Sequence, residues 1–222
     1  MKKYIVEVLK TDFITHNVKR FVTERPAGYS FVSGQATDVA INKPGLENEL
    51  RPFTFTCIND WDQLEFIIKI YTGHDGITEK LLDVSVGDQL IVHDVFGTIS
   101  YKGPGVFIAG GAGITPFISI FRDLKQRNEL PGNKLLFADR KAEDIILKDE
   151  LSAMLGRDHL DILQTPPSPD IPGGFIDETL LKQHLGDEKT FFYICGPDKF
   201  TSVMIETLLG LGVKNSQLVF EQ

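Results

Sequence analysis

The sequence predicts two domains of different fold class, an antiparallel β-barrel in residues 1–103 and a doubly wound, parallel α/β sheet in residues 104–222. The first prediction depends on short runs of β-branched and aromatic residues separated by turn residues, a pattern typical of antiparallel barrels. The second depends on apolar runs that alternate with amphipathic helical segments, a pattern typical of parallel sheets. The turn residues of segment 102–105, Lys-Gly-Pro-Gly, mark the boundary.

The barrel half is predicted to contain several short strands and one helix. Each strand has the length and residue composition expected for a barrel, and glycine, proline or asparagine separates it from the next. The helix is expected from Thr78 to Leu82. The expected strands are 4–8, 18–22, 37–41, 53–56, 64–71 and 89–92.

The second half is predicted to repeat a strand followed by a helix. Helices are expected to begin at Thr115, Ala142, Asp177 and Asp198, and residues 166–169 are expected to form a short loop. The carboxyl ends of parallel strands collect ligands, so candidate residues are sought there. The expected strands are 106–109, 134–138, 159–163, 191–195 and 218–220.

Composition and charge exclude several classes of protein and partner. Hydrophobic residues make up 42% of the 222 residues and charged residues 24%, which is typical of a folded globular chain. The net charge is −8 and neither half is basic, so we expect no nucleic-acid partner and no membrane partner. There is no signal-peptide pattern and no apolar run of membrane-spanning length. Cys57 and Cys195 are too few for a zinc site or an iron–sulfur cluster, so we expect no metal and a cytoplasmic location.

A glycine-rich turn follows the first strand of the α/β half. Gly111 and Gly113 allow a sharp turn, and Ile114 leads into the next helix. Thr115 is expected to cap that helix and Pro116 to occupy its first position. The free N–H groups would then bind an anion such as a diphosphate. The spacing ends in proline where the dinucleotide fingerprint has glycine, so a turn without a ligand remains an alternative.

Two other strand ends carry candidate residues. Cys195, Gly196 and Pro197 end the fourth strand, where the thiol is either part of a site or a small buried apolar group. Asp139 and Arg140 end the second strand, where a ribose is bound in Rossmann-type sites. The aspartate suits a free ribose hydroxyl, and Arg140 suits a phosphate. An ordinary solvated turn is the alternative.

Two segments of the barrel half also suit phosphate binding. Arg51, Pro52, Phe53 and Thr54 place a guanidinium, an aromatic ring and a hydroxyl at the start of a strand. A surface arginine beside a core phenylalanine explains the same residues without a ligand. The loop 73–78 contains glycine and opens a helix, so it either binds a diphosphate or only provides a cap at Thr78.

Taken together in this order, these motifs resemble the ferredoxin–NADP reductase family over nearly the whole chain. Arg-Pro-Phe-Thr at 51–54 is similar to the family's flavin-binding segment, with phenylalanine in place of the usual tyrosine. Gly-Ile-Thr at 76–78 is similar to its second phosphate loop, and Gly-Ala-Gly-Ile-Thr-Pro at 111–116 to its nucleotide loop. Cys-Gly-Pro at 195–197 is similar to the family's motif beside the nicotinamide, and Gly34-Gln35 to its Gly-Gln pair.

The resemblance implies FAD as cofactor and NADH or NADPH as co-substrate. It places Arg51 at the flavin diphosphate, Phe53 along the flavin and Thr54 near the reactive nitrogen. It makes Cys195, Thr54 and Glu221 the catalytic candidates, and it leaves open whether Phe220 covers the flavin. The remaining implied contacts to the cofactors are Pro52, Lys69, Tyr71, Gly76, Ile77, Thr78, Gly111, Gly113, Ile114, Thr115, Pro116, Asp139, Arg140, Gly196 and Pro197.

The predicted function is transfer of electrons from NAD(P)H through FAD to a separate acceptor, because the chain has no cysteine-rich segment for its own iron–sulfur cluster. Flavodoxin or ferredoxin is the expected acceptor. Such partners are usually acidic, so a basic patch formed by residues such as Arg20, Arg25 and Lys43 would have to overcome the charge of −8. A reductase of free flavin and a non-catalytic binding module are the alternatives. The sequence leaves open FMN against FAD, NADH against NADPH, and the oligomeric state.

Overall fold

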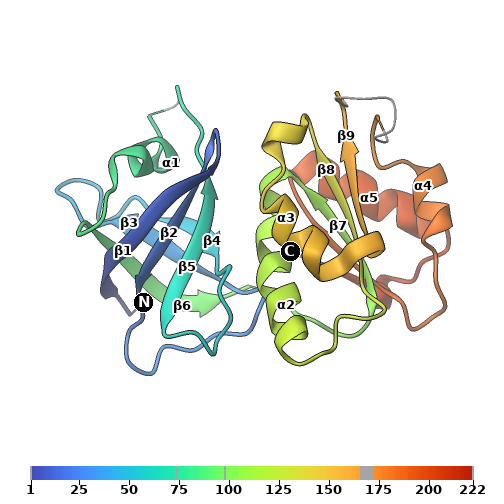
Figure 1. Ribbon diagram of the computed structural model, residues 1–222, viewed down its shortest axis with the longest axis horizontal. Coiled ribbons are helices and arrows are strands. Elements are labelled where there is room, and N and C mark those ends of the chain that lie inside the picture. The colour runs from blue at the N-terminus through green and yellow to red at the C-terminus, as the bar shows by residue number, and fades with distance from the viewer. Residues whose placement is uncertain (1, 74, 98, 166–172, 222) are drawn as a thin grey trace.

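The computed structural model describes residues 2–73, 75–97, 99–165 and 173–221, so the loop expected at 166–169 lies outside the described residues. Two layered units lie side by side, a barrel on the N-terminal side and an α/β unit on the C-terminal side (Figure 1). The expected fold classes are both confirmed. None of the helices in the described residues is long and apolar enough to cross a membrane.

The barrel is one antiparallel sheet with the strand order β4-β3-β6-β1-β2-β5. A bridge between Phe55 and Phe66 joins the two ends of this order and closes the barrel. The interior contains fully buried aromatic rings, including Phe21, Phe55 and Phe66. Its strands are β1 (Tyr4–Thr15), β2 (Val18–Glu24), β3 (Ala36–Ile41), β4 (Arg51–Thr54), β5 (Gln63–Lys69) and β6 (Gln89–Phe96).

The single helix of this half differs from its prediction at the first turn. Helix α1 covers Ile77–Lys80 and continues as the 3₁₀ turn η1, Leu81–Asp83. Its N-cap is Gly76, without a side-chain cap, and Thr78 lies inside the helix. The expected cap at Thr78 is therefore wrong. The extended backbone of Gly76 begins the helix without help from a hydroxyl group.

A buried lysine joins this helical segment to the barrel wall. Lys19, on β2, is 6% exposed, and its ammonium group donates to the carbonyls of Leu81, Leu82 and Val84 at 3.2, 2.8 and 2.7 Å. Its charge also lies 5.2 Å from the ring centroid of Phe21. Burial lowers the pKa of Lys19, and the three carbonyls offset part of the cost of burying the charge. The lysine thus satisfies carbonyl groups at the end of the helical segment, as a C-terminal cation does in other helices.

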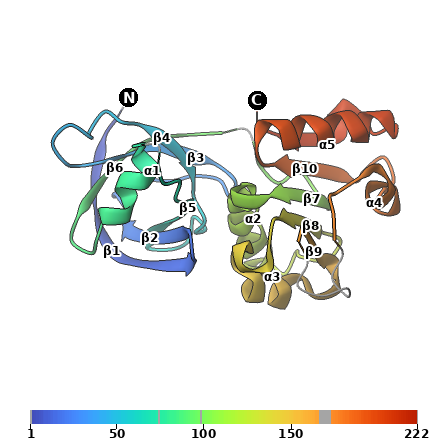
Figure 2. The same ribbon diagram turned by 90° about the horizontal axis from the view of Figure 1, so that it is seen from above.

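The α/β unit is a parallel sheet with the strand order β11-β10-β7-β8-β9. Helices α2 and α3 cover one face, and α4 and α5 cover the other (Figure 2). Its strands are β7 (Gly105–Gly110), β8 (Lys134–Asp139), β9 (His159–Leu163), β10 (Phe191–Cys195) and β11 (Leu218–Phe220). Its helices are α2 (Thr115–Gln126), α3 (Lys148–Leu155), α4 (Glu178–Gln183) and α5 (Asp198–Gly210), with 3₁₀ turns η2 (Gly111–Ile114), η3 (Ala142–Asp144), η4 (Gly156–Asp158) and η5 (Asn215–Gln217).

In the α/β unit, three predicted helix starts are accurate and one is displaced. Helix α2 begins at Thr115, as predicted. Asp177 caps α4 by accepting the N–H of Leu180 at 2.8 Å, and α5 begins at Asp198. The helix expected from Ala142 is instead the single turn η3, and α3 begins only at Lys148. The separation occurs because Leu147 has a φ of 51°, in the left-handed region, where a continuous α-helix cannot pass.

Helix α2 lies between the sheet and the barrel (Figure 2). Its buried residues share one apolar cluster with Val18, Ile67 and Ile99 of the preceding half. The backbone N–H of Gly34 also donates to the Ser119 hydroxyl of α2 at 3.0 Å. A single helix therefore positions the two units relative to each other.

Replacement of Lys19 by methionine is expected to lower the free energy of unfolding by about 2–4 kcal/mol, because buried carbonyls would lose a charged donor. Urea unfolding measures the change. Lys10→Met on neighbouring β1 is the matched control, since Lys10 is exposed, and it should change stability by less than about 0.5 kcal/mol. Equal effects of the two substitutions would contradict the role given to Lys19.

Candidate functional site

The glycine turn after β7 forms the 3₁₀ turn η2 and leads directly into α2. Gly111 has a φ of +55°, a conformation that most residues avoid. The predicted cap at Thr115 is wrong, because the N-cap of α2 is Ile114 and the Thr115 hydroxyl donates to the carbonyl of Ala112 at 3.0 Å. Pro116 was expected at the first helical position and is the second residue of α2, still within the first turn.

The glycine turn lies so close to the end of β10 that a side chain at Gly113 would clash with it. A Cβ atom on Gly113 would lie 2.2 Å from the carbonyl oxygen of Cys195, so only glycine fits there. Cys195 and Gly196 therefore lie against the glycine turn, although far from it in sequence. The structure brings together the two motifs that the sequence placed at separate strand ends.

Phe200 supports this contact and was not predicted. A Cβ on Gly110 would lie 3.0 Å from the Phe200 ring, and one on Gly196 would lie 2.6 Å from it. The ring is held by α5, which begins immediately after Pro197. No periodic signal in the sequence identifies this aromatic, because its partners are glycines, one at the end of β7 and one between β10 and α5.

The Cys195 thiol is partly buried and protonated at neutral pH. Burial, with a contribution from the charge of Glu221, raises the pKa of Cys195 to about 12. Glu221 therefore lies close enough to act on the thiol, although it is exposed itself. The thiol is a neutral, polarisable group beside the glycine turn, not a nucleophilic thiolate.

Asp139 is a buried carboxyl group at the end of β8. It is 7% exposed, and its Oδ2 atom has no hydrogen-bond partner among the described residues. Its Oδ1 atom lies 3.8 Å from the position that a Cβ on Gly111 would occupy. Burial raises its pKa to about 7, with Lys69 lowering it and Asp144 and Asp161 raising it. An orphaned buried acceptor beside a glycine turn fits a hydroxyl donor from a ligand.

Arg140 and the two predicted barrel residues Lys69 and Tyr71 occupy different environments. Arg140 is exposed and follows Asp139 on the outside of the strand end. Lys69 ends β5 and is partly buried, and its charge acts on Asp139 from the barrel side. Tyr71 is 53% exposed. Lys69 and Asp139 thus extend the site across both units.

The segment Arg51–Thr54 forms β4, paired with β3. Arg51 and Pro52 are exposed, and the Arg51 guanidinium donates locally, to the Leu50 carbonyl at 2.7 Å. Phe53 and Thr54 are half-buried, and Phe53 packs against the barrel core. The strand therefore presents a cation at the surface above an aromatic ring.

The second glycine loop already binds an anionic group of the chain. Glu79, the third residue of α1, accepts the N–H of Gly73 at 2.9 Å and that of Asp75 at 2.8 Å. The sequence carried a signal for this contact, since glutamate at this helix position commonly reaches back to preceding amides. A phosphate at this loop would meet Gly76, Ile77 and Thr78, beyond the amides that Glu79 occupies.

The C-terminal aromatic lies within the α/β unit. Phe220 ends β11, pairs with Ile194 and packs against the apolar cluster on the α5 side of the sheet. Phe220 is only partly buried by this packing, so its contact with a flavin stays a prediction.

The basic patch considered for Arg20, Arg25 and Lys43 does not form. Arg20 makes a two-bond ion pair with Asp12, at 3.0 and 2.7 Å. Arg25 is held by backbone carbonyls, including that of Tyr29, and Lys43 pairs with Asp88 at 3.0 Å. Each charge is committed to a neighbour, so these residues do not provide a surface for an acidic partner.

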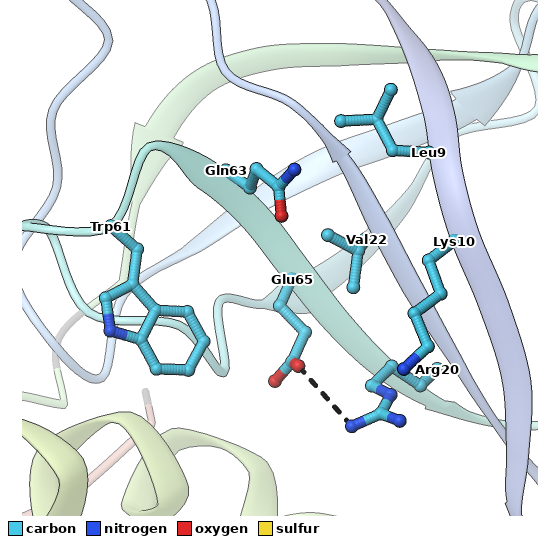
Figure 3. A pocket seen from close by; sticks show the side chains of 7 residues that line it. All are labelled: Leu9, Lys10, Arg20, Val22, Trp61, Gln63 and Glu65. Atoms are coloured by element: carbon cyan, nitrogen blue, oxygen red, sulfur yellow. Dashed lines mark ion pairs between the residues drawn. The ribbon is translucent and has the colours of Figure 1, made fainter.

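A surface groove of about 380 Å³ lies on the barrel, and Arg20 is one of its lining residues (Figure 3). It crosses β1, β2 and β5, with Trp61 at one end and Lys10 at the other. None of the residues predicted for cofactor binding lines it. Its lining residues are Leu9, Lys10, Arg20, Val22, Trp61, Gln63 and Glu65.

Comparison with known proteins agrees with this geometry. Residues 107–205 match the family described as "Oxidoreductase NAD-binding domain". NADH-cytochrome b5 reductase 1 of Coccidioides immitis is 30% identical over 230 residues, covering 93% of this chain and 74% of the relative. The reductase component of propane 2-monooxygenase of Rhodococcus jostii is 28% identical over 221 residues, and the match covers 91% of this chain but only 58% of that relative.

Solved structures share the fold over the full chain. A ferredoxin NADP+ reductase of Neisseria gonorrhoeae, with bound FAD and NADP, superposes with a TM-score of 0.86 at 22% identity, covering 100% of this chain and 98% of the other. The FAD/NAD-binding domain of a nitric oxide dioxygenase of Vibrio cholerae gives a TM-score of 0.86 at 22% identity, with 98% and 97% covered. The chain belongs to the ferredoxin–NADP reductase family of NAD(P)H-dependent flavoprotein oxidoreductases.

Proposed function

We propose that this chain accepts a hydride from NADH onto FAD held by the barrel and passes the electrons to a separate redox protein. The observation that carries the proposal is the contact of Gly113 with the Cys195 carbonyl, which joins the two predicted nucleotide motifs at one edge of the parallel sheet. We assign residues 1–103 to flavin binding and residues 104–222 to nucleotide binding. Free thiols at Cys57 and Cys195 support a cytoplasmic location.

The residues present fit both cofactors. The buried, unpartnered Oδ2 of Asp139 suits a ribose hydroxyl, and the space left by Gly113 suits a nucleotide close to the backbone. On the barrel, the exposed guanidinium of Arg51 suits a diphosphate. A bound flavin would supply the hydride acceptor and release electrons singly.

The chain's own contribution is placement and polarity. Backbone amides at the start of α2 are oriented toward the nucleotide side, and the positive end of the helix favours its phosphates. The Cys195 thiol stays protonated, since its pKa is raised to about 12, so it adds no charge beside the reacting ring. Thr54 would donate a hydrogen bond near the flavin, and Glu221 would lie on the opposite side beside Cys195. Holding donor and acceptor in a fixed geometry is the main catalytic effect expected here.

NADH is the proposed nucleotide. Asp139 faces the Gly111 turn from a buried position, whereas Arg140 is exposed. A carboxylate accepts from a free ribose hydroxyl and repels a 2′-phosphate. The relatives named NADH-cytochrome b5 reductase support the same preference.

The acceptor is proposed to be a one-electron redox protein. The names of the relatives include cytochrome b5 and an oxygenase system, so a haem protein or an oxygenase component stands beside flavodoxin and ferredoxin. The engagement of Arg20, Arg25 and Lys43 with neighbouring groups weakens the case for a strongly acidic partner.

A second candidate function is reduction of free flavin as a substrate. It is favoured by Glu79, which occupies amides of the second phosphate loop and so leaves fewer donors for a tightly held diphosphate.

Anaerobic titration of the FAD-reconstituted protein with NADH is expected to bleach the flavin absorbance with one equivalent of nucleotide, and NADPH should act more slowly. Gel filtration before the titration distinguishes the two candidate functions, because a resident cofactor elutes with the protein and a substrate does not. A protein that retains the flavin but is not reduced by either nucleotide contradicts both.

Arg51→Ala is expected to yield folded protein with flavin affinity reduced about 10- to 100-fold, because a charge-assisted contact of ~1.5–3 kcal/mol is lost. Equilibrium binding followed by flavin fluorescence measures the change. Arg157→Ala is the control, since Arg157 is also exposed but lies in η4 of the other unit. An unchanged affinity in the Arg51 variant would remove this residue from the site.

Asp139→Asn is expected to change how stability depends on pH. With a pKa of about 7, the folded wild-type protein keeps the Asp139 proton between pH 4 and 7, where the unfolded chain has lost it. The contribution of Asp139 to the free energy of unfolding is therefore highest at pH 4. It falls by about 3 kcal/mol as the pH rises from 4 to 7.

In Asp139→Asn, this fall in the free energy of unfolding between pH 4 and 7 should be absent. Asp149→Asn, at an exposed position of α3, should show the same fall as wild type. Urea unfolding at several pH values gives the comparison. The ratio of kcat/KM for NADH to kcat/KM for NADPH should fall in Asp139→Asn and stay unchanged in Asp149→Asn. Identical pH profiles in wild type and Asp139→Asn would show that the carboxyl group titrates normally.

A further inference from the structure

Arg122 forms a charged network across the junction between the barrel and α2. Its side chain is 9% exposed. Nη1 donates to the Thr56 carbonyl at 2.8 Å and to Oε1 of Glu65 at 2.6 Å, both in the barrel half. Nε and Nη2 donate to Glu150 of α3 at 2.6 and 2.9 Å. One guanidinium therefore joins α2 to a barrel strand and to a neighbouring helix.

The charges of this network persist at neutral pH. Burial alone would lower the pKa of Arg122, but the hydrogen bonds and charges of Glu150 and Glu65 raise it overall. Burial opposes ionisation of Glu150, and Arg122 nevertheless lowers the pKa of Glu150. Glu65 is also bound by the Thr56 hydroxyl at 2.7 Å, and Arg20 lies 4.0 Å away. A buried carboxylate with these partners fixes the guanidinium in one geometry.

The position of Arg122 on α2 connects the network to the nucleotide site. Helix α2 begins at Thr115, directly after the glycine turn, so Arg122 lies seven residues, or about 10 Å, along the same rigid helix. Between them, the Ser119 hydroxyl accepts the N–H of Gly34 at 3.0 Å. On the barrel side, Glu65 belongs to β5, whose last residue, Lys69, acts on Asp139. Displacement of Arg122 from Glu65 would move the nucleotide turn relative to the barrel.

We infer that Arg122 is a positioning residue that sets the distance between the nucleotide turn and the flavin-binding barrel. The inference rests on the proposed function. It assigns to Arg122 no contact with either cofactor, because the guanidinium is bonded to Thr56 after β4, to Glu65 of β5 and to Glu150 of α3. Without the guanidinium, α2 would keep its apolar contacts with the barrel but lose the directional bonds that fix its register.

The sole tryptophan of the chain reports on this junction. Trp61 is 39% exposed and lies at one end of the surface groove (Figure 3). The Arg122 guanidinium lies 5.1 Å from the centroid of the Trp61 ring. Quenching of its fluorescence by acrylamide therefore measures contact between α2 and the barrel in the protein without cofactors.

The test compares Arg122→Met with Arg127→Met. Arg127 follows the end of the same helix and is 45% exposed, and within the described residues its ion pairs are with Asp123 and Glu129, not with the barrel. We expect Arg122→Met to retain FAD, to lower the limiting rate of flavin reduction at saturating NADH at least 10-fold, and to increase Trp61 quenching. Arg127→Met should leave all three unchanged, and Arg122→Lys should recover part of the rate.

Glu65→Gln provides a second variant in case Arg122→Met does not fold, because it keeps an acceptor for Arg122 and removes only the charge. It should lower the limiting rate in the same direction by a smaller factor. A rate within twofold of wild type in whichever of the two variants folds overturns the inference, as does an equal loss in Arg127→Met. A wild-type protein that binds FAD but is not reduced overturns the proposed function instead, and Trp61 quenching still reports whether Arg122 holds α2 on the barrel.

Discussion

The structure depends on one close approach of backbone to backbone, where Gly113 meets the carbonyl of Cys195. A side chain at Gly113 would place its Cβ 2.2 Å from that oxygen, so the ends of β7 and β10 can meet only through glycine. The neighbouring glycines at 110 and 196 likewise leave room for the Phe200 ring, which a Cβ atom at either position would crowd. The ends of β7 and β10 are thereby held together, with the protonated Cys195 thiol beside the glycine turn.

This edge gains its function from its placement against the barrel, and α2 provides that placement. The helix carries the glycine turn at one end, and Ser119 and Arg122 contact the barrel half further along. Apolar packing of α2 against Ile67 and Ile99 buries surface but does not fix the orientation of the helix. The ion pair of Arg122 with Glu65 is directional and does fix it. Two separate cores can thus act as one site because they share a single rigid element.

The sequence was sufficient for the fold class and for most strands, because hydrophobic periodicity and turn residues are local signals. It also identified the motifs at 111–116 and 195–197, since each contains residues that only a tight turn requires. The caps expected at Thr115 and Thr78 were wrong because extended or 3₁₀ backbone begins those helices without a side chain. The buried contacts of Lys19 and Arg122 could not be predicted from the sequence, since their partners lie on segments distant in sequence and no local pattern marks a buried cation.

The charge of the chain bears on which kind of redox protein can accept its electrons. The chain carries −8, and the buried or half-buried cations Lys19, Arg20 and Arg122 are matched by carboxylates or carbonyls. Charges committed in this way stabilise loops and the domain junction but contribute little to long-range attraction. An acidic acceptor would therefore approach against the net field, and its association would quicken as salt screens the repulsion. An acceptor with a basic or apolar contact surface meets no such barrier, so the net charge favours an acceptor with that kind of surface, whatever its redox group.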